Sequence, residues 1–242
     1  MKLSIIVPVY FNEANLKPLY EDIKAVVLDN LNMDYEIVMV DDGSKDDSYN
    51  EILRLKEQDK NIVAVKLSKN FGSHAAILAG LSVCTGDCAT MKAADLQEPS
   101  KIILKMVEKW KLGTKSVLAV RADREESFFQ KGFSNAYYNS MRKYALPSMP
   151  KGGFDCFLID RDVINLLNQM EEKNTTLMGQ ILWCGFKTDT VYYVRKKREI
   201  GKSRWTLRKK IKLFIDSFLG FSYATIRAIF TIGVLYFIGT II

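Results

Sequence analysis

The chain has 242 residues, 48% of them hydrophobic, with a formal net charge of +7, four cysteines and one histidine. This length allows one main domain with a full hydrophobic core and an additional tail. Because the cysteines show neither paired CxxC spacing nor a histidine-rich neighbourhood, we expect no zinc site and reduced thiols.

The positive charge is concentrated near the end of the sequence. Residues 195–212 contain ten Lys or Arg and one Glu, and the rest of the chain carries 25 basic and 27 acidic residues. We therefore expect a nearly neutral main domain and a basic segment that meets an anionic partner, either a membrane or a nucleic acid. Met1 and Lys2 run directly into the apolar Leu3–Val9, so no secretory leader is expected.

Short runs rich in β-branched residues alternate with longer segments of helical period through the first half of the chain. The predicted strands are Leu3–Val9, Glu36–Val40, Ile62–Leu67, Cys88–Met91 and Ser116–Val120. The predicted helices are Leu16–Leu31, Asp47–Gln58, Ser73–Val83 and Ser100–Lys111. This order predicts βαβ units, and hence a Rossmann-like α/β domain whose mostly parallel central sheet is covered by helices on both faces.

In such sheets the ligand crevice lies beyond the carboxyl ends of the strands. The polar residues that follow the predicted strands are therefore the candidates for a binding site. They are Tyr10, Glu13, Asp41, Asp42, Lys69, Asn70, Asp95, Gln97, Arg121 and Arg124.

The alternation changes after about residue 126. A helical stretch over Phe128–Tyr144 is followed by the Pro- and Gly-containing loop Pro147–Gly153 and by a strand-like run, Cys156–Ile159. Two more helical segments precede a final predicted strand over Thr188–Val194, so we place the end of the main domain at residue 194.

The tail has two parts. Over residues 195–221, basic residues surround an apolar face that consists of Leu207, Ile211, Phe214, Phe218 and Phe221, which predicts an amphipathic helix in the membrane interface. Residues 228–242 carry no charge, and since a spanning helix needs roughly 20 apolar residues, residues 222–242 predict a partial transmembrane helix. The basic run places the main domain on the cytoplasmic side. The alternative is a solvated basic face before a buried helix.

Two motifs offer oxygen ligands at predicted strand ends. Asp41 and Asp42 are followed by Gly43, which permits a sharp turn, and carboxylates there can accept hydrogen bonds from a ribose or a base edge. The alternative is an ordinary Asp-Gly-Ser turn. Asp95 and Gln97 also follow a strand, and Mg²⁺ or Mn²⁺, which can neutralise a diphosphate, favours such oxygens.

Six motifs occur along the chain: Ile6-Val7-Pro8-Val9-Tyr10, Asp41-Asp42-Gly43-Ser44, Asn70-Phe71-Gly72, Asp95-Leu96-Gln97, Phe154-Asp155-Cys156-Phe157-Leu158 and Arg198-Glu199-Ile200-Gly201-Lys202-Ser203-Arg204-Trp205. With them the chain resembles, over essentially its whole length, the inverting glycosyltransferases of family 2, and among these the dolichyl- and polyisoprenyl-phosphate glycosyltransferases. The resemblance implies a nucleotide-sugar-binding domain of the glycosyltransferase A type. It also implies sugar transfer from a UDP- or GDP-sugar to a polyisoprenyl phosphate of undecaprenyl type, at the cytoplasmic face of the cell membrane and among anionic lipids. The sugar, the base of the donor, the acceptor length and the oligomeric state, including a homo-oligomer, stay open.

The resemblance further implies the residues of the site. Nucleotide-sugar binding falls on Pro8, Tyr10, Glu13, Asp41, Asp42, Asn70 and Asp95. Acceptor-phosphate binding falls on Arg121, Lys131, Ser134, Arg198, Ser203 and Arg204. Asp95 and Gln97 become metal ligands, and Asp155 becomes the catalytic base; the alternative for Asp155 is a carboxylate that caps a turn.

One departure from the family concerns the metal. Family members usually carry Asp-x-Asp before Leu-Gln, and here Ala93 takes the first position. We still expect Mg²⁺ or Mn²⁺ at Asp95 and Gln97, but with fewer anionic ligands the affinity falls or the ion relies on diphosphate oxygens and water. Lys92 offers charge to the diphosphate instead, unless its side chain points to the opposite face.

Other classes of function stand as alternatives. Ala93 raises the hypothesis of a catalytically weakened nucleotide-sugar-binding membrane scaffold, and a non-lipid glycan acceptor is the alternative among glycosyltransferases. The sequence contains no Gln-x-x-Arg-Trp motif, which argues against a processive polysaccharide synthase. No nucleic-acid-binding motif is evident, so no nucleic acid partner is expected.

Overall fold

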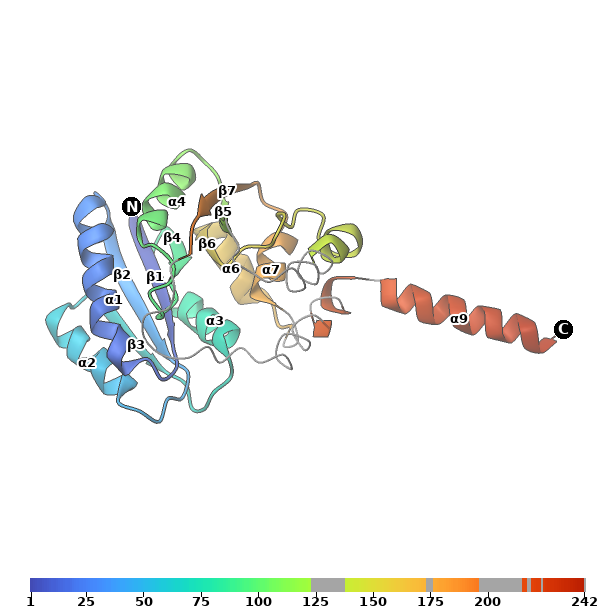
Figure 1. Cartoon of the computed structure of the whole chain (residues 1–242), viewed down its shortest axis with the longest axis horizontal. Helices are drawn as coiled ribbons and strands as arrows, with labels where there is room; N and C mark the ends of the chain where they lie inside the picture. The colour runs from blue at the N-terminus through green and yellow to red at the C-terminus, as the bar shows by residue number, and fades with distance from the viewer. Residues whose placement is uncertain (123–137, 173–175, 196–214, 217–218, 223, 242) are drawn as a thin grey trace. The chain divides into compact units, whose positions relative to one another are not determined.

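The structure is a computed structural model, and it describes residues 1–122, 138–172, 176–195, 215–216, 219–222 and 224–241 (Figure 1). The chain divides into two compact units. The first consists of Met1–Glu125, Phe154–Glu171 and Cys184–Ser203, and the second of Glu126–Gly153, Glu172–Trp183 and Arg204–Ile242. The predicted domain boundaries at 1–194, 195–221 and 222–242 stay a prediction.

A seven-stranded sheet forms the centre of the first unit (Figure 1). Its strands are β1 (Lys2–Val9), β2 (Asp34–Asp41), β3 (Ile62–Lys66), β4 (Cys88–Met91), β5 (Ser116–Arg121), β6 (Cys156–Asp160) and β7 (Thr188–Tyr193). They lie in the order β3-β2-β1-β4-β6-β5-β7, in which β6 runs antiparallel to both neighbours and the other pairs are parallel. The mostly parallel sheet is thus confirmed. Because β6 runs the other way, its first residue lies at the carboxyl edge of the remaining strands.

Helices cover both faces of this sheet (Figure 1). The apolar residues of α1 (Glu13–Val26), α2 (Ser48–Gln58) and α4 (Lys101–Lys111) form one core with the alternate residues of β1 that face them. The other face is covered by α3 (Ser73–Val83) and α6 (Arg161–Gln169). Gly80 lets α3 lie close to the sheet, because a Cβ there would come within 2.4 Å of Ile6 Cγ2.

Within the first unit the predicted strands and helices agree with the observed ones to within a few residues, except at the first helix. Of the helix predicted over Phe128–Tyr144, residues 128–137 lie outside the described residues, as do most residues of the amphipathic helix predicted within 195–221. The apolar period predicts a helix over Leu16–Leu31, whereas α1 covers Glu13–Val26 and is followed by a short 3₁₀ helix, Leu28–Asn30. Asn12, the residue before α1, is held by a contact with a distant part of the sequence, because its amide donates to Ser48 Oγ at 2.9 Å. Such a tertiary hydrogen bond leaves no trace in the hydrophobic period.

Within the second unit the described residues include a helical segment at 138–144, α7 (Leu177–Trp183) and α9 (Ala224–Ile241). A Cβ at Gly179 of α7 would lie 2.2 Å from Phe221 Cε2, so this glycine leaves the space into which the Phe221 ring fits. The same ring lies 6.0 Å from the Trp183 ring, measured between centroids. The structure therefore places Phe221 against α7, which differs from its predicted position on the lipid-facing side. Phe214 and Phe218 lie outside the described residues.

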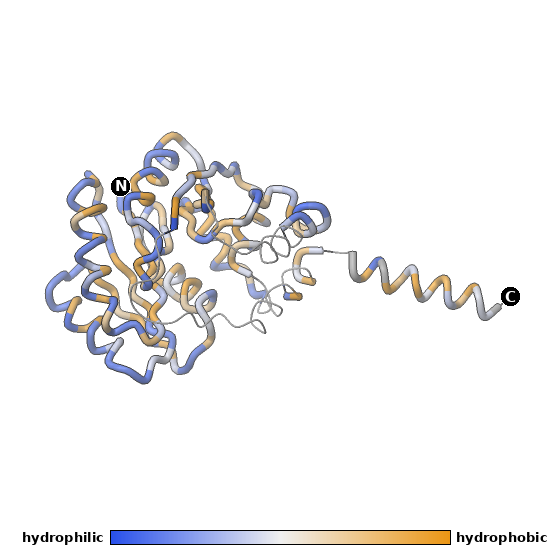
Figure 2. The backbone as a smooth tube through the Cα atoms, viewed as in Figure 1, coloured by the Kyte–Doolittle hydropathy of each residue, from blue (hydrophilic) through white to orange (hydrophobic). Residues whose placement is uncertain are grey.

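The helix α9 is apolar along nearly its whole length (Figure 2). Arg227 is its one charged residue. Large side chains with exposed fractions between 63% and 76% are Ile226, Ile229, Phe230, Ile232, Leu235, Tyr236 and Phe237. None of the helices in the described ranges combines the length and the apolarity that crossing a membrane requires. The structure thus does not support the partial transmembrane helix predicted for residues 222–242.

A buried carboxylate fastens the amino ends of β1 and β2 together. Glu36 accepts hydrogen bonds from Ser4 Oγ at 2.6 Å, from the Thr85 amide at 2.6 Å and from Lys2 Nζ at 2.8 Å. Burial alone would raise the pKa of Glu36, but the hydrogen bonds from these three residues outweigh it and lower the pKa to about 2. The charged form is therefore the one that the fold stabilises.

Glu36→Gln should lower the free energy of unfolding at neutral pH by about 1–3 kcal/mol, because charged hydrogen bonds are lost inside the protein. The folded pKa lies below the ordinary value of 4.5, so the contribution of the carboxylate is complete above 4.5 and is lost as the pH falls toward about 2. Chemical denaturation over this range should show the difference from wild type shrinking. Glu108→Gln, at an exposed position of α4, is the control; equal stability of both variants would contradict the role of Glu36.

Candidate active site

Polar residues from distant parts of the sequence meet at the carboxyl edge of the sheet. Asp41 ends β2, Arg121 ends β5, and Asp155 directly precedes the antiparallel β6. The amide of Asp155 donates to the Ala119 carbonyl at 3.1 Å, which fixes Asp155 beside the end of β5. These three predicted site residues therefore lie together at the carboxyl edge, and their role in a site stays a prediction.

Asp42 organises the loop Asn70–Gly72. Its carboxylate accepts hydrogen bonds from the side-chain amide of Asn70 at 2.9 Å and from the two following backbone amides at 2.7 and 2.9 Å. Burial raises the pKa of Asp42, and the hydrogen bonds from the loop amides oppose that rise. Gly43, with φ of 70°, permits the loop to pass closely, because a Cβ would lie 2.6 Å from the Lys69 carbonyl carbon. Two residues predicted to bind the donor, Asp42 and Asn70, thus bind each other.

The carboxylate of Asp41 has fewer hydrogen-bond partners among the described residues than that of Asp42. It is fully buried, and its Oδ1 accepts the Ser44 amide at 3.2 Å. Its Oδ2 is also buried and has no hydrogen-bond partner among the residues that the structure describes. A buried acceptor without a partner costs about 1–3 kcal/mol or more. A hydrogen-bond donor from a ligand would remove this cost.

The loop after β1 is tied to the loop after β2. Three hydrogen bonds connect them: the Phe11 amide to Ser44 Oγ at 3.0 Å, the Asn12 amide to Ser48 Oγ at 2.9 Å and the Asp47 amide to Glu13 Oε2 at 2.7 Å. The carboxylate of Glu13 thereby holds the loop that leads to α2. Pro8 is half-buried at the end of β1, and Tyr10 follows it with its ring edge-on to Phe11. The three hydrogen bonds thus connect the loop that contains Tyr10 and Glu13 to the loop that follows Asp41 and Asp42.

Asp155 and Arg121 form a bidentate ion pair. Arg121 donates from Nη2 to Oδ1 at 2.8 Å and from Nε to Oδ2, and the Tyr193 hydroxyl donates to Oδ2 at 3.0 Å. Burial lowers the pKa of Arg121, but the Asp155 carboxylate outweighs it and the net shift is upward. Burial and the same carboxylate raise the pKa of Tyr193. Gly152 and Gly153, shortly before Asp155, have φ of 81° and 71°, a left-handed conformation that glycine adopts readily.

A second arginine binds the two residues predicted as metal ligands. Arg195 donates from Nη2 to Gln97 Oε1 at 2.6 Å and forms an ion pair with Asp95 Oδ2 at 3.4 Å. Between them, Leu96 has φ of 58°, a left-handed conformation that side chains adopt at a cost of about 1–3 kcal/mol. The Gln97 amide closes this turn on Asp95 Oδ1 at 3.2 Å. Strained turns of this kind are typical of binding sites.

Lys92 is held inside the domain. Only 1% of its surface is exposed, and its Nζ donates to the backbone carbonyl of Glu98. Burial is the main reason why the pKa of the Glu98 carboxyl group is raised to about 6. The negative charges of Asp95 and Asp155 also raise this pKa, whereas the positive charge of Lys92 lowers it. Lys92 is therefore not available to a diphosphate. Because Asp95 and Asp155 both raise the pKa of Glu98, the carboxylates of the two arginine–carboxylate pairs act electrostatically on the same buried residue.

The residues predicted to hold a divalent metal fit such an ion poorly. Ala93 supplies no ligand, and Asp95 and Gln97 both bind Arg195. The described part of the chain contains no group of three His, Cys, Asp or Glu that could hold a metal ion. Since Mg²⁺ takes about six oxygen ligands, one carboxylate and one amide would leave most positions to other molecules. No step through a metal follows from these residues.

Five predicted acceptor-site residues lie outside the described residues, namely Lys131, Ser134, Arg198, Ser203 and Arg204. Their assignment stays a prediction. Tyr193 and Arg195 were not predicted as site residues, because the first reads as a strand residue and the second as part of the basic run. To predict these two residues one would need to know that β7 pairs in parallel with β5, which places Tyr193 opposite Arg121.

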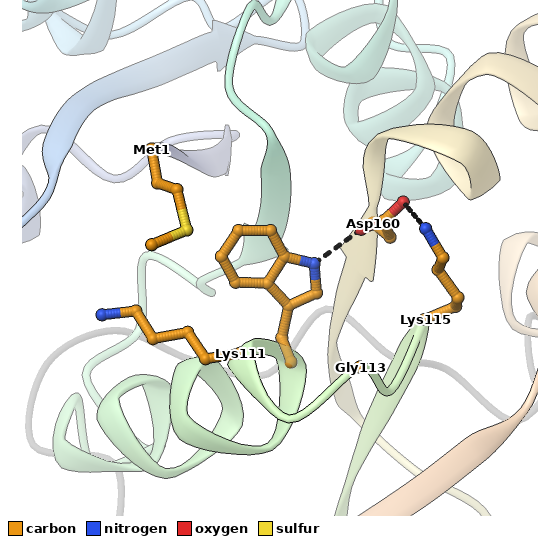
Figure 3. Close-up of a pocket in the computed structure, with 6 residues that line it drawn as sticks. Met1, Lys111, Gly113, Lys115 and Asp160 are labelled. Carbon is orange, nitrogen blue, oxygen red and sulfur yellow. Dashed lines mark hydrogen bonds and ion pairs between the residues drawn. The ribbon is translucent and has the colours of Figure 1, made fainter.

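A cavity of about 280 Å³ lies at the other end of the strands (Figure 3). It is lined by Met1, Trp110, Lys111, Gly113, Lys115 and Asp160. Asp160 accepts hydrogen bonds from Trp110 Nε1 at 2.7 Å and from Lys115 Nζ at 2.8 Å (Figure 3). Because β1 and β5 begin here, the cavity is separate from the residues at the carboxyl edge.

A mostly parallel sheet with acidic and basic residues at its carboxyl edge defines an α/β domain of the class that binds ligands beyond the strand ends. A family model described as glycosyl transferase family 2 matches residues 4–167. An uncharacterized glycosyltransferase of Bacillus subtilis (strain 168), YkcC, is 36% identical over 97% of this chain and 73% of its own length. A prophage bactoprenol glucosyl transferase homolog of Escherichia coli (strain K12) is 33% identical over 94% of this chain and 74% of its own length. The chain belongs to glycosyltransferase family 2 and is a glycosyltransferase.

Solved structures give the same fold. The mannosyltransferase PcManGT from Pyrobaculum calidifontis, in complex with GDP-Man and Mn²⁺, matches with a TM-score of 0.59 and 18% identity over 83% of this chain and 58% of that one. Glucosyl-3-phosphoglycerate synthase from Mycobacterium tuberculosis, with Mn²⁺, UDP-Glc and phosphoglyceric acid, matches with a TM-score of 0.55 and 13% identity over 88% and 76%. These likenesses show the fold, which is that of the glycosyltransferase A type.

Asp42→Asn should loosen the loop Asn70–Gly72, because an amide nitrogen would face hydrogen-bond donors that now meet a carboxylate. We expect trypsin to cut faster after Lys69 and the free energy of unfolding to fall by about 1–3 kcal/mol. Timed proteolysis with mass spectrometry measures the first effect. Asp162→Asn changes an exposed carboxylate at the opposite edge and serves as the control. Equal cleavage rates in both variants would show that Asp42 does not hold the loop.

Proposed function

We propose that this protein is an inverting glycosyltransferase that moves a sugar from a nucleoside-diphosphate sugar to a polyisoprenyl phosphate of undecaprenyl type, at the cytoplasmic face of the cell membrane. The observation that carries the proposal is Asp41, whose buried Oδ2 has no hydrogen-bond partner among the described residues. An N–H of a base or an O–H of a ribose would satisfy this oxygen. The tied loops around Asp41 form the donor side of the site.

The relatives support both substrates. Two of them carry the names bactoprenol glucosyl transferase or its homolog, from Shigella phage SfX and Escherichia coli (strain K12). Structures with the same fold contain GDP-Man or UDP-Glc. Together these names favour a lipid-linked phosphate as the acceptor and a nucleotide-sugar as the donor of this chain.

Arg121 and Asp155 supply the acceptor side. A guanidinium fork binds phosphate oxygens in pairs and stays charged at every physiological pH. Asp155 now occupies that fork through both of its oxygens. We infer that the acceptor phosphate binds Arg121 on the donors that Asp155 leaves free, while Asp155 and Tyr193 keep the guanidinium oriented.

The transfer is then a single displacement. An oxygen of the acceptor phosphate forms a bond to the anomeric carbon while the bond from that carbon to the diphosphate oxygen breaks, and the electron pair leaves with the nucleoside diphosphate. Attack from the opposite face inverts the configuration. A phosphate oxygen is already a nucleophile, so Asp155 contributes by orienting the acceptor and by accepting any remaining proton.

Radiolabelled UDP-glucose, UDP-N-acetylglucosamine and GDP-mannose, each offered with undecaprenyl phosphate in vesicles, test the proposal. One label should become soluble in organic solvent. Asp155→Asn, assayed at a temperature at which the variant is folded, should reduce that turnover at least about a hundredfold, because the charge beside Arg121 is lost. Asp34→Asn, at an exposed position of β2, is the control.

The other outcomes separate the alternatives. Label that moves only into a water-soluble glycan would favour the non-lipid acceptor. A donor that binds without release of nucleoside diphosphate would favour the catalytically weakened scaffold. Turnover of Asp155→Asn within a few-fold of wild type would make Asp155 a structural residue.

We also propose that the tail holds the protein on an anionic membrane. Residues 195–212 carry ten basic residues against one acidic residue, and each basic residue near such a surface contributes about 1 kcal/mol. Phe230 and Phe237 of α9 are 72% and 64% exposed, and lipid would cover this apolar surface. The side of the membrane follows from the basic run alone.

The full chain should sediment with vesicles that contain phosphatidylglycerol, and more weakly with neutral vesicles. The double change Phe230→Glu and Phe237→Glu should reduce sedimentation at least about tenfold at moderate salt, because two carboxylates would have to enter the lipid. Leu112→Glu, which alters a residue 87% exposed in the first unit, is the matched control. Unchanged sedimentation of the double variant would remove α9 from the membrane contact.

A further inference from the structure

Arg195 binds the two residues, Asp95 and Gln97, at which the family resemblance implies a divalent cation. Its Nη2 lies 2.6 Å from Gln97 Oε1 and 3.4 Å from Asp95 Oδ2, the two predicted metal ligands. Its side chain is 27% exposed and that of Asp95 12% exposed, so this ion pair is largely shielded from water. A metal ion at the same oxygens would have to displace the guanidinium or lie against it, and two cations at that distance repel each other strongly.

The buried Nε of Arg195 has no hydrogen-bond partner among the described residues. An unpaired buried N–H of a charged group is costly. A phosphate oxygen is the acceptor that a guanidinium fits best, because the fork offers parallel N–H groups to paired oxygens. The unpaired donor therefore indicates an anionic ligand at Arg195.

The neighbouring cations are engaged elsewhere. Lys92 is buried and bonded to the Glu98 carbonyl, and Arg121 is bidentate with Asp155. Ala93 has removed one of the carboxylates that a metal would need. Among the described Lys and Arg residues, Arg195 is thus the one with a buried side-chain donor that lacks a hydrogen-bond partner.

We propose that Arg195 binds the diphosphate of the donor and serves in place of a divalent metal. The proposal rests on the proposed function, since it assigns the cation at that same donor site. When the bond to the anomeric carbon breaks, the electron pair stays on the diphosphate, which gains one negative charge. The fixed positive charge of Arg195 stabilises this charge without any proton transfer. Asp95 and Gln97 then act as the clamp that positions the guanidinium.

Calorimetric titration of the full chain with UDP and with GDP tests the binding step, each in EDTA and in MnCl₂. At least one nucleotide should bind in EDTA with an affinity within about twofold of that in MnCl₂. Arg195→Gln should weaken this binding at least about tenfold, and Arg195→Lys should weaken it less, because the charge stays while the fork is lost. Arg54→Gln, which removes an exposed arginine of α2, is the matched control. Tighter binding by tenfold or more in MnCl₂, or equal binding by Arg195→Gln and wild type, would overturn the proposal.

Electron paramagnetic resonance of Mn²⁺ alone provides a second readout. Wild type should leave the free Mn²⁺ signal unchanged. The double change Ala93→Asp and Arg195→Gln restores a carboxylate and removes the guanidinium, so it should reduce that signal. Saturable Mn²⁺ binding by wild type would contradict the proposal.

Transfer assays separate this inference from the proposed function. If label reaches the lipid in EDTA at the rate seen in MnCl₂, and Arg195→Gln slows it by about 10²–10³-fold, both hold. If label reaches the lipid only in MnCl₂, the function stands and the role of Arg195 falls. If no label moves under either condition while UDP or GDP binding still depends on Arg195, the inference holds and the proposed transfer fails.

Discussion

The pairing of charge at the carboxyl edge of the sheet is the constraint on which the rest of the site depends. A shielded carboxylate without a partner is costly, and so is a shielded guanidinium. Asp155 is paired with Arg121, and Asp95 with Arg195. Each arginine keeps further N–H donors beyond those its carboxylate uses. The charges at the edge are thereby balanced before any substrate arrives, and in the proposed function the remaining donors bind the two phosphate-bearing substrates.

The topology of the sheet brings these four residues together. Parallel strands direct Asp95 and Arg121 to one edge, and the reversal of β6 brings the beginning of that strand, with Asp155, to the same edge. The pairing of β7 with β5 adds Tyr193 and leads the chain directly to Arg195. The donor loops are fixed separately by hydrogen bonds between the residues after β1 and those after β2. Sheet order therefore explains why side chains one hundred positions apart in the sequence, those of Asp95 and Arg195, lie in contact.

The α/β fold could be predicted, and so could the candidate site residues that follow the strands. Both depend on local properties of the sequence, namely the period of the apolar residues and the polar residues that come directly after each strand. The role of Asp42 could not, since the direction of its carboxylate depends on a loop that passes over Gly43. The ion pair between Asp95 and Arg195 could not be predicted either, because Arg195 belongs to the basic run, for which the sequence predicts contact with a membrane. The position of Phe221 could not be predicted for the same reason. The helical period predicts that its ring faces lipid, whereas the ring packs in the space that Gly179 leaves on α7.

In the proposed transfer, two anions are held in line at this edge while a sugar passes between them once. The most direct measurement is the anomeric configuration of the lipid-linked product, determined by NMR after reaction with an α-linked nucleotide-sugar and undecaprenyl phosphate. We expect a β-linked sugar phosphate, because a single displacement inverts the anomeric carbon. An α-linked product, which needs two displacements or attack from the leaving-group side, would contradict it.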